Sequence, residues 1–173
     1  MPARAYLLTG RPGVGKTTCL RKALELAARP AGGFFTEEIR EGGTRIGFAL
    51  ETLDGRRATL AHVGHRVGPR VGKYGVDLEA LEAVGVPAIL NAVRLGQLVV
   101  VDEVGKMELA SAAFRAAVEQ ALQSPAPVLG AILQAPHPWA DRVKARPGVE
   151  LFTVTLANRD TLPQELAARV SPA

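Results

Sequence analysis

A glycine-rich segment near the start of the chain has the residue types and spacing needed to bind phosphate. Residues 10–17, GRPGVGKT, match the pattern G-x-x-x-x-G-K-[ST] at every fixed position. Glycines let successive backbone N–H groups turn inward around a phosphate, and the start of a following helix adds partial positive charge. Lys16 can reach the β- and γ-phosphates of a nucleotide, and the Thr17 hydroxyl can bind Mg²⁺. The segment therefore predicts a phosphate-binding loop.

The whole of this loop is expected to contact nucleotide. Thr18, the next residue, is placed to contact the α-phosphate. Lys16 is also a predicted catalytic residue, because its charge can stabilise the transferred phosphoryl group. The predicted nucleotide-binding residues of the loop are Gly10, Arg11, Pro12, Gly13, Val14, Gly15, Lys16, Thr17 and Thr18. A glycine-rich turn with an incidental lysine is the alternative, but the apolar run before the loop and the helical pattern after it favour a phosphate site.

A pair of acids follows an apolar run in the middle of the chain. Residues 98–101, LVVV, precede Asp102 and Glu103. An aspartate after such a run is typical of the second motif of nucleotide sites, so Asp102 and Thr17 are the predicted Mg²⁺ ligands. Glu103 is placed to orient or deprotonate an attacking water, which favours hydrolysis over binding alone. The alternative interpretation is a capped strand end with solvated acids.

Polar residues also follow two later predicted strands. Asn158 and Arg159 lie after the last strand, where many α/β nucleotide folds place the base-binding loop. Arg159 could stack on a purine or a pyrimidine without choosing between them. The alternative is that Asn158 and Asp160 cap the final helix. Gln134, at the end of an earlier strand, is a candidate sensor of the γ-phosphate.

A basic run without acids extends over residues 56–73. Arg70 and Lys73 adjoin the glycine-rich segment VGKYGV, and Lys106 follows closely on the predicted metal aspartate. Each is an accessory candidate for an arginine-finger or phosphate-clamp contact. A solvated charged face is the alternative interpretation of these cations.

The periodicity of the chain predicts strands that alternate with helices. Continuous apolar runs predict strands at residues 5–9, 98–101, 128–133 and 149–155. Helical patterns cover residues 17–29, 77–96, 109–122, 137–145 and 162–170, with Pro87 expected to kink or divide the second helix. Residues 44–50 and 56–60 flank Asp54-Gly55 and predict an inserted β-hairpin, followed by a loop over residues 61–76. This order indicates an α/β fold with a mostly parallel sheet.

Composition sets the class of protein. The 173 residues are 47% hydrophobic and 22% charged, which predicts one globular domain spanning residues 1–173. Cys19 is the only cysteine, so an intrachain disulfide is excluded and a cytoplasmic location is expected. No leader peptide or membrane span is expected, since no apolar run approaches the roughly 20 residues that a bilayer requires. The net charge of +4 suits anionic ligands.

Five segments together resemble one known family. They are TGRPGVGKTT at 9–18, GGFFTEEIREGGTRIGF at 32–48, VGKYGV at 71–76, VVDEVGKMEL at 100–109 and NRDTL at 158–162. In this order they are similar to the cancer-related nucleoside-triphosphatase family. The resemblance implies a three-layer, RecA-like P-loop NTPase fold in which Glu103 is the catalytic base. It also implies that another strand, for which residues 128–133 are the candidate, lies between the phosphate-loop strand and the Asp102 strand.

These observations predict a Mg²⁺-dependent phosphohydrolase that converts ATP, GTP, CTP and UTP to diphosphates and acts as a monomer. A small nucleoside or nucleotide kinase is one alternative, because the loop at residues 10–16 also resembles that of such enzymes. An NTP-dependent, RNA-associated switch is another, motivated by the basic charge. Aromatic residues make up only 5% of the chain, and no nucleic-acid recognition motif supports the switch.

Overall fold

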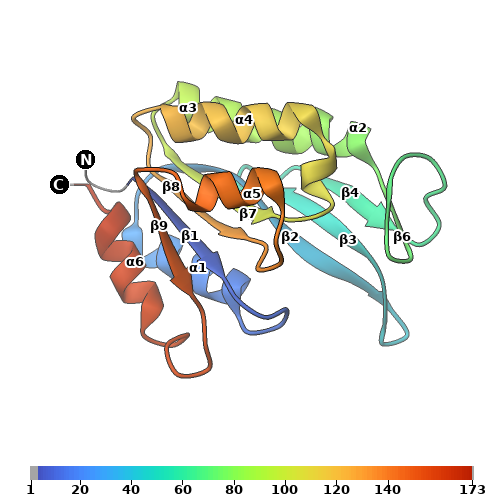
Figure 1. Ribbon diagram of the computed structural model, residues 1–173, viewed down its shortest axis with the longest axis horizontal. Coiled ribbons are helices and arrows are strands. Elements are labelled where there is room, and N and C mark those ends of the chain that lie inside the picture. The colour runs from blue at the N-terminus through green and yellow to red at the C-terminus, as the bar shows by residue number, and fades with distance from the viewer. Residues whose placement is uncertain (1–3, 173) are drawn as a thin grey trace.

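One mixed sheet organises residues 4–172, which are the residues that the computed structural model describes (Figure 1). Its nine strands are β1 (Ala5–Thr9), β2 (Ala31–Glu41), β3 (Thr44–Thr52), β4 (Arg57–His62), β5 (Arg70–Val71), β6 (Tyr74–Val76), β7 (Leu98–Val104), β8 (Val128–Ile132) and β9 (Val149–Thr153). Their order across the sheet is β5-β6-β4-β3-β2-β7-β8-β1-β9.

The half of the sheet from β2 to β9 is parallel. β8 lies between β1 and β7, pairing Gly130 with Leu7 on one side and with Val101 on the other. Every residue of β1 and β8 is buried, as expected for strands that are covered on both faces. The predicted strand between the phosphate-loop strand and the Asp102 strand is therefore confirmed.

Helices cover both faces of this parallel half. The helical segments are α1 (Lys16–Ala27), α2 (Leu78–Ala80), the π-helical η1 (Leu81–Gly85), α3 (Val86–Arg94), the 3₁₀-helical η2 (Glu108–Ala110), α4 (Ala112–Gln123), α5 (Pro138–Lys144) and α6 (Leu162–Val170). One buried cluster joins α1 and α6 to the sheet, and a second joins α3, α4 and α5 to the opposite face. Figure 1 shows the two helix groups on either side of the strands. The three-layer α/β prediction is confirmed.

The remaining strands extend the sheet as an antiparallel meander beyond β2. β3 pairs with both β2 and β4, so the predicted hairpin is present, but β2 adds a further hairpin before it. The loop predicted over residues 61–76 is wrong in part, because β6 pairs with β4 and β5 with β6. These strands are too short for periodicity to reveal. A β-carbon on Gly75 would lie 1.9 Å from the carbonyl oxygen of His65, so this glycine permits a close backbone approach that sequence reads as a loop.

The helix predicted over residues 77–96 is interrupted as expected. Asp77 caps its start, accepting a hydrogen bond from the Ala80 backbone N–H at 3.0 Å. The π-helical turn η1 precedes Pro87, which lies in the first turn of α3. Proline has no N–H to continue the preceding ladder, so the chain restarts there as a new α-helix. No helix within residues 4–172 is long and apolar enough to cross a membrane.

Candidate nucleotide-binding and active site

The predicted phosphate loop connects the end of β1 to the start of α1. Gly15 is the N-cap of α1 and has φ of 111°, in the region that residues with side chains rarely adopt. Lys16, the first residue of the helix, folds back over the loop and donates from Nζ to the Gly10 carbonyl oxygen at 2.9 Å. The loop thus combines a helix N-terminus with an ammonium group that spans it, which is the arrangement a phosphate chain needs.

The two predicted metal ligands lie in contact. Thr17 donates from its hydroxyl to Oδ2 of Asp102 at 2.7 Å, although 85 positions separate them in sequence. Asp102 is only 3% exposed, so its side chain is no solvated acid at a strand end. Burial raises the pKa of the Asp102 carboxyl to about 7, and the hydrogen bond from Thr17 opposes this shift.

This pair fits a hard cation that shares its ligands with phosphate. No group of three or more His, Cys, Asp or Glu side chains within residues 4–172 could hold a metal. One carboxylate and one hydroxyl are nevertheless oxygen donors of the kind that Mg²⁺ takes from proteins, with substrate phosphates and water completing its shell.

Glu103 lies inside β7 rather than after it. The predicted strand 98–101 continues to Val104, and the register with β8 shifts between Val101 and Val104. Glu103 is half-buried, and its Oε2 is buried without a hydrogen-bond partner in the described part of the chain. A buried oxygen without a partner is costly unless a water or ligand satisfies it, so Glu103 retains the capacity to accept a proton or hydrogen bond.

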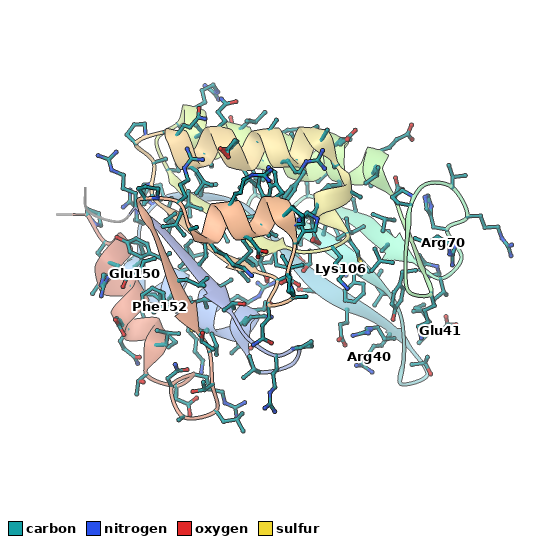
Figure 2. The ribbon with its side chains drawn as sticks, viewed as in Figure 1. Arg40, Glu41, Arg70, Lys106, Glu150 and Phe152 are labelled. Carbon is teal, nitrogen blue, oxygen red and sulfur yellow. The ribbon has the colours of Figure 1, made fainter. Side chains whose placement is uncertain are left out.

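A cavity of about 420 Å³, here called the large cavity, joins Glu103 to the phosphate loop. Lys16 and Glu103 both line it, as do Lys106 and Gln134. Two of the candidates proposed from sequence, Lys106 and Gln134, are therefore brought to the predicted reaction centre. Figure 2 shows Lys106 near the middle of the molecule, below α4 and over the strands.

A second cavity of about 300 Å³, here called the small cavity, adjoins the same loop and shares Gly10 and Gln134 with the large cavity. It lies between the phosphate loop, through Arg11 and Val14, and the segment that follows β9. Arg159 reaches back over the loop, donating from Nη1 to the Val14 carbonyl oxygen at 3.5 Å. The sequence predicts that the nucleotide base binds in this region, at Asn158 and Arg159.

Asn158 shapes the turn beside the small cavity. Its side-chain amide donates to the Thr153 carbonyl at 2.9 Å, and its Oδ1 accepts from the Thr155 N–H at 2.8 Å. The alternative in which Asn158 and Asp160 cap the final helix is wrong, because the N-cap of α6 is Thr161.

Comparison with known proteins settles the family. A profile of the family described as NTPase matches residues 5–167. This chain belongs to that NTPase family. The nucleoside-triphosphatase THEP1 of Thermofilum pendens is 51% identical to this NTPase, over 99% of this chain and 97% of the relative. The cancer-related nucleoside-triphosphatase of Homo sapiens is 42% identical, over 97% of each chain.

A solved structure agrees with the fold of this NTPase. The crystal structure of THEP1 from the hyperthermophile Aquifex aeolicus superposes with a TM-score of 0.88 at 32% identity, covering 97% of this chain and 99% of the other. The resemblance proposed from the five sequence segments is confirmed, as is the α/β P-loop NTPase fold.

Two accessory cations of this NTPase lie elsewhere. Arg70 donates from its guanidinium to the carbonyls of Lys73 and His65, at 2.8 and 3.3 Å, so it holds its own loop together. Lys73 lies over the Tyr74 ring, 5.5 Å from its centroid. In Figure 2 Arg70 is on the outlying loop beyond β4, apart from Lys106. Neither cation lines the large cavity, and their clamp role stays a prediction.

One residue that lines the site, Glu108, is not predicted from the sequence patterns. Glu108 is 4% exposed, lines the large cavity and accepts a hydrogen bond from the Gly105 N–H through Oε2 at 3.0 Å. Burial raises the pKa of Glu108 to about 8, and the nearby Glu103 carboxylate raises it further. A glutamate directly before an apolar helical pattern is typical of a helix start, so this pattern does not identify Glu108 as a site residue. The turn at Gly105 is the only local signal that Glu108 has another role.

Proposed function

We propose that this NTPase is a Mg²⁺-dependent phosphohydrolase of broad nucleotide specificity that converts a nucleoside triphosphate and water to a diphosphate and phosphate. The observation that carries the proposal is the large cavity, which is lined both by Lys16 and by Glu103, a half-buried glutamate with an unpartnered oxygen. The Thr17–Asp102 pair lies beside this cavity, where a cation bridging the β- and γ-phosphates belongs.

Each residue then has a defined task. The backbone amides of residues 10–17 bind the phosphates, and Lys16 exchanges its hydrogen bond to Gly10 for one to the β- and γ-phosphates. The water oxygen attacks the γ-phosphorus while Glu103 takes a proton from that water. The bond from the γ-phosphorus to the β–γ bridging oxygen breaks, and the nucleoside diphosphate leaves. Thr17 and Asp102 would hold Mg²⁺, which supplies neutralisation of the charge that develops on the phosphate oxygens.

Broad specificity follows from how the base is held. Arg159 is exposed and lies over the loop, where its planar guanidinium can stack on any base. Stacking uses the face of a base and leaves its hydrogen-bonding edges unread. ATP, GTP, CTP and UTP are therefore all proposed substrates.

The proposal extends to a monomer that acts in the cytoplasm. The phosphate loop, the metal pair and the predicted base all come from one chain, which supports a monomer. Cys19 is buried against the sheet as a free thiol, which suits a reducing compartment.

Phosphate release from ATP, GTP, CTP and UTP, measured with Mg²⁺ and with EDTA, tests this function. We expect metal-dependent release from all four nucleotides, and a Lys16→Ala preparation purified in parallel excludes contaminating phosphatases. Release that EDTA does not affect would overturn the metal assignment. Release from one nucleotide only would overturn the broad specificity.

A further inference from the structure

The large cavity is bigger than hydrolysis requires. A lytic water needs the space of one solvent molecule, about 30 Å³, whereas this cavity measures about 420 Å³. The nucleotide accounts for only part of this space, because its γ-phosphate belongs beside Gly10 and Lys16, which line the cavity, whereas its base is expected at the small cavity and Arg159. The space beyond the γ-phosphate is thus available to a second molecule, and its size is within the range of small-molecule sites.

The meander builds the outer wall of this cavity. Four strands each contribute one side chain to it, namely Thr36 of β2, Phe48 of β3, Leu60 of β4 and Val71 of β5. Three of the four are apolar. The strands β3, β4 and β5 carry no residue of the phosphate loop or the metal pair, and Glu103 is not on them either. Hydrolysis alone therefore does not explain why the meander lines the site.

The wall is held in place by its own contacts. Phe48 packs edge-on against Tyr74 of β6, with ring centroids 5.3 Å apart. Arg45 covers the same two rings, and its Nε donates to the Tyr74 hydroxyl at 2.8 Å. An aromatic wall fixed in this way is a preformed surface, which favours binding because little freedom is lost when a ligand arrives.

The rest of the cavity lining is partly apolar and partly charged. Met107 and Leu133 add to the apolar lining, whereas Glu103, Lys106 and Glu108 are its ionisable members besides Lys16 of the loop. Lys106 forms no ion pair or hydrogen bond with the rest of residues 4–172. The cavity therefore combines an apolar lining with an unpaired cation, Lys106, and with the carboxylate assigned as base, Glu103.

We propose that the large cavity binds a second substrate, a small alcohol with an apolar body, which accepts the γ-phosphoryl group in place of water. The inference rests on the proposed function, since it uses the same nucleotide, the same metal pair and the same base. The apolar body would lie against Phe48, Leu60 and Met107, and the hydroxyl would point to Glu103.

The transfer balances without a further reactant. The hydroxyl oxygen of the acceptor bonds to the γ-phosphorus, and the bond from that phosphorus to the β–γ bridging oxygen breaks. The nucleoside diphosphate leaves with the electron pair, and the hydroxyl proton passes to the Glu103 carboxylate. Lys106 is then placed to pair with the new phosphate monoester.

Alcohols of increasing apolar size test the second substrate. The protein is incubated with ATP, Mg²⁺ and equal concentrations of methanol, propan-1-ol or benzyl alcohol, and ³¹P NMR gives the ratio of alkyl phosphate to inorganic phosphate. We expect benzyl phosphate to exceed methyl phosphate by at least about tenfold, because each buried methylene favours binding by roughly fourfold. Val71→Trp, which fills the cavity, should lower the benzyl ratio toward the methanol ratio.

Val67→Trp is the matched control, since Val67 lies on the same connection, is 76% exposed and does not line the cavity. Its ratios should equal those of the wild type. Met107→Trp fills the cavity from another part of its lining and repeats the test if the Val71 variant does not fold.

Two outcomes would overturn the second substrate: ratios that do not depend on the alcohol, or a benzyl ratio unchanged in both filled variants. Such results would leave a side chain of a protein partner as the better occupant of the cavity. Diphosphate release without alcohol reports separately on the hydrolase. Alkyl phosphate formed without any hydrolysis would overturn the hydrolase while supporting the second substrate.

Discussion

At the residue scale, Gly105 lies close to two glutamates of the site, Glu103 and Glu108. A β-carbon on Gly105 would lie 2.9 Å from Oε2 of Glu108 and 3.2 Å from Cγ of Glu103. The Gly105 N–H donates to Glu108, so the buried carboxyl holds the backbone two residues after the predicted base. Glu108 therefore helps to hold the turn that follows Glu103.

Glu108 should make stability depend on pH. Its pKa is about 8 in the folded protein against an ordinary value of 4.5, so the native state holds the proton more tightly than the unfolded state does. The associated stability is fully present below about pH 4.5 and is lost as pH rises toward 8. Glu108→Gln keeps an acceptor for Gly105 without the titration.

Urea unfolding of both proteins at pH 5, 6.5 and 8 measures this effect. The free energy of unfolding of the wild type, relative to Glu108→Gln, should fall across the series. A difference that is the same at all three pH values would contradict the buried, protonated carboxyl.

Lys16 supports a second prediction at this scale. Lys16→Ala removes the cation that spans the loop, so triphosphate affinity and turnover should both fall, by about tenfold or more in each case. Lys22→Ala, an exposed lysine on the same helix, is the matched control and should bind as the wild type does. Unchanged affinity of Lys16→Ala, measured by titration calorimetry, would count against the phosphate loop.

At the scale of elements, α4 begins directly after the connection that carries Lys106 and Glu108. Ser111 is its N-cap, accepting from the Phe114 N–H at 3.0 Å and donating to Glu82 of η1 at 2.8 Å. Ser111→Ala should lower the free energy of unfolding by about 1 kcal/mol, the usual cost of a lost cap. Denaturant unfolding checks this value, and an unchanged midpoint would show that the cap does not hold the helix.

The strands differ in how well sequence patterns predict them. β1 and β8 are continuous apolar runs buried on both faces, and both were predictable because such runs have one common explanation in an α/β chain. β5 and β6 have two and three residues, and their pairing depends on contacts that are distant in sequence. No local pattern carries that information, so the part of the outer wall that β5 contributes through Val71 could not be foreseen, whereas the hairpin that carries Phe48 and Leu60 could.

The same contrast holds within the site. Thr17 and Asp102 could be paired from sequence, because the two motifs that carry them belong to one kind of nucleotide site. The burial of Glu108 could not be predicted from sequence, since a helix-start pattern does not reveal what covers a side chain. The distance of Arg70 from the cavity likewise depends on the meander.

At the scale of the whole molecule, the two halves of the sheet contribute different parts of the site. Its parallel half carries the phosphate loop, the metal pair and Glu103, and its antiparallel half closes the large cavity. Helices pack on both faces of the parallel half, where the two buried clusters hold the loop and β7 in fixed register (Figure 1).

Cys19 reports on the stability of this whole arrangement. It is 1% exposed in the cluster between α1 and the sheet, and burial raises the pKa of its thiol to about 11. Very little reactive thiolate is present at pH 8, so a thiol reagent such as DTNB should label it only after unfolding. Added ATP with Mg²⁺ should slow labelling, because ligand binding stabilises the folded state. Rapid labelling of the native protein would contradict this packing.

The most direct test of the central claim is a paired measurement of nucleotide affinity and phosphate release in Glu103→Gln. Glu37→Gln is the matched control, because Glu37 is an exposed glutamate on β2 that pairs with Arg21 at 3.2 Å. We predict that Glu103→Gln binds ATP with unchanged affinity while turnover falls by about a hundredfold or more, as expected for loss of a general base, and that the control keeps wild-type turnover. Wild-type turnover in Glu103→Gln would contradict the assignment of Glu103 as the catalytic base.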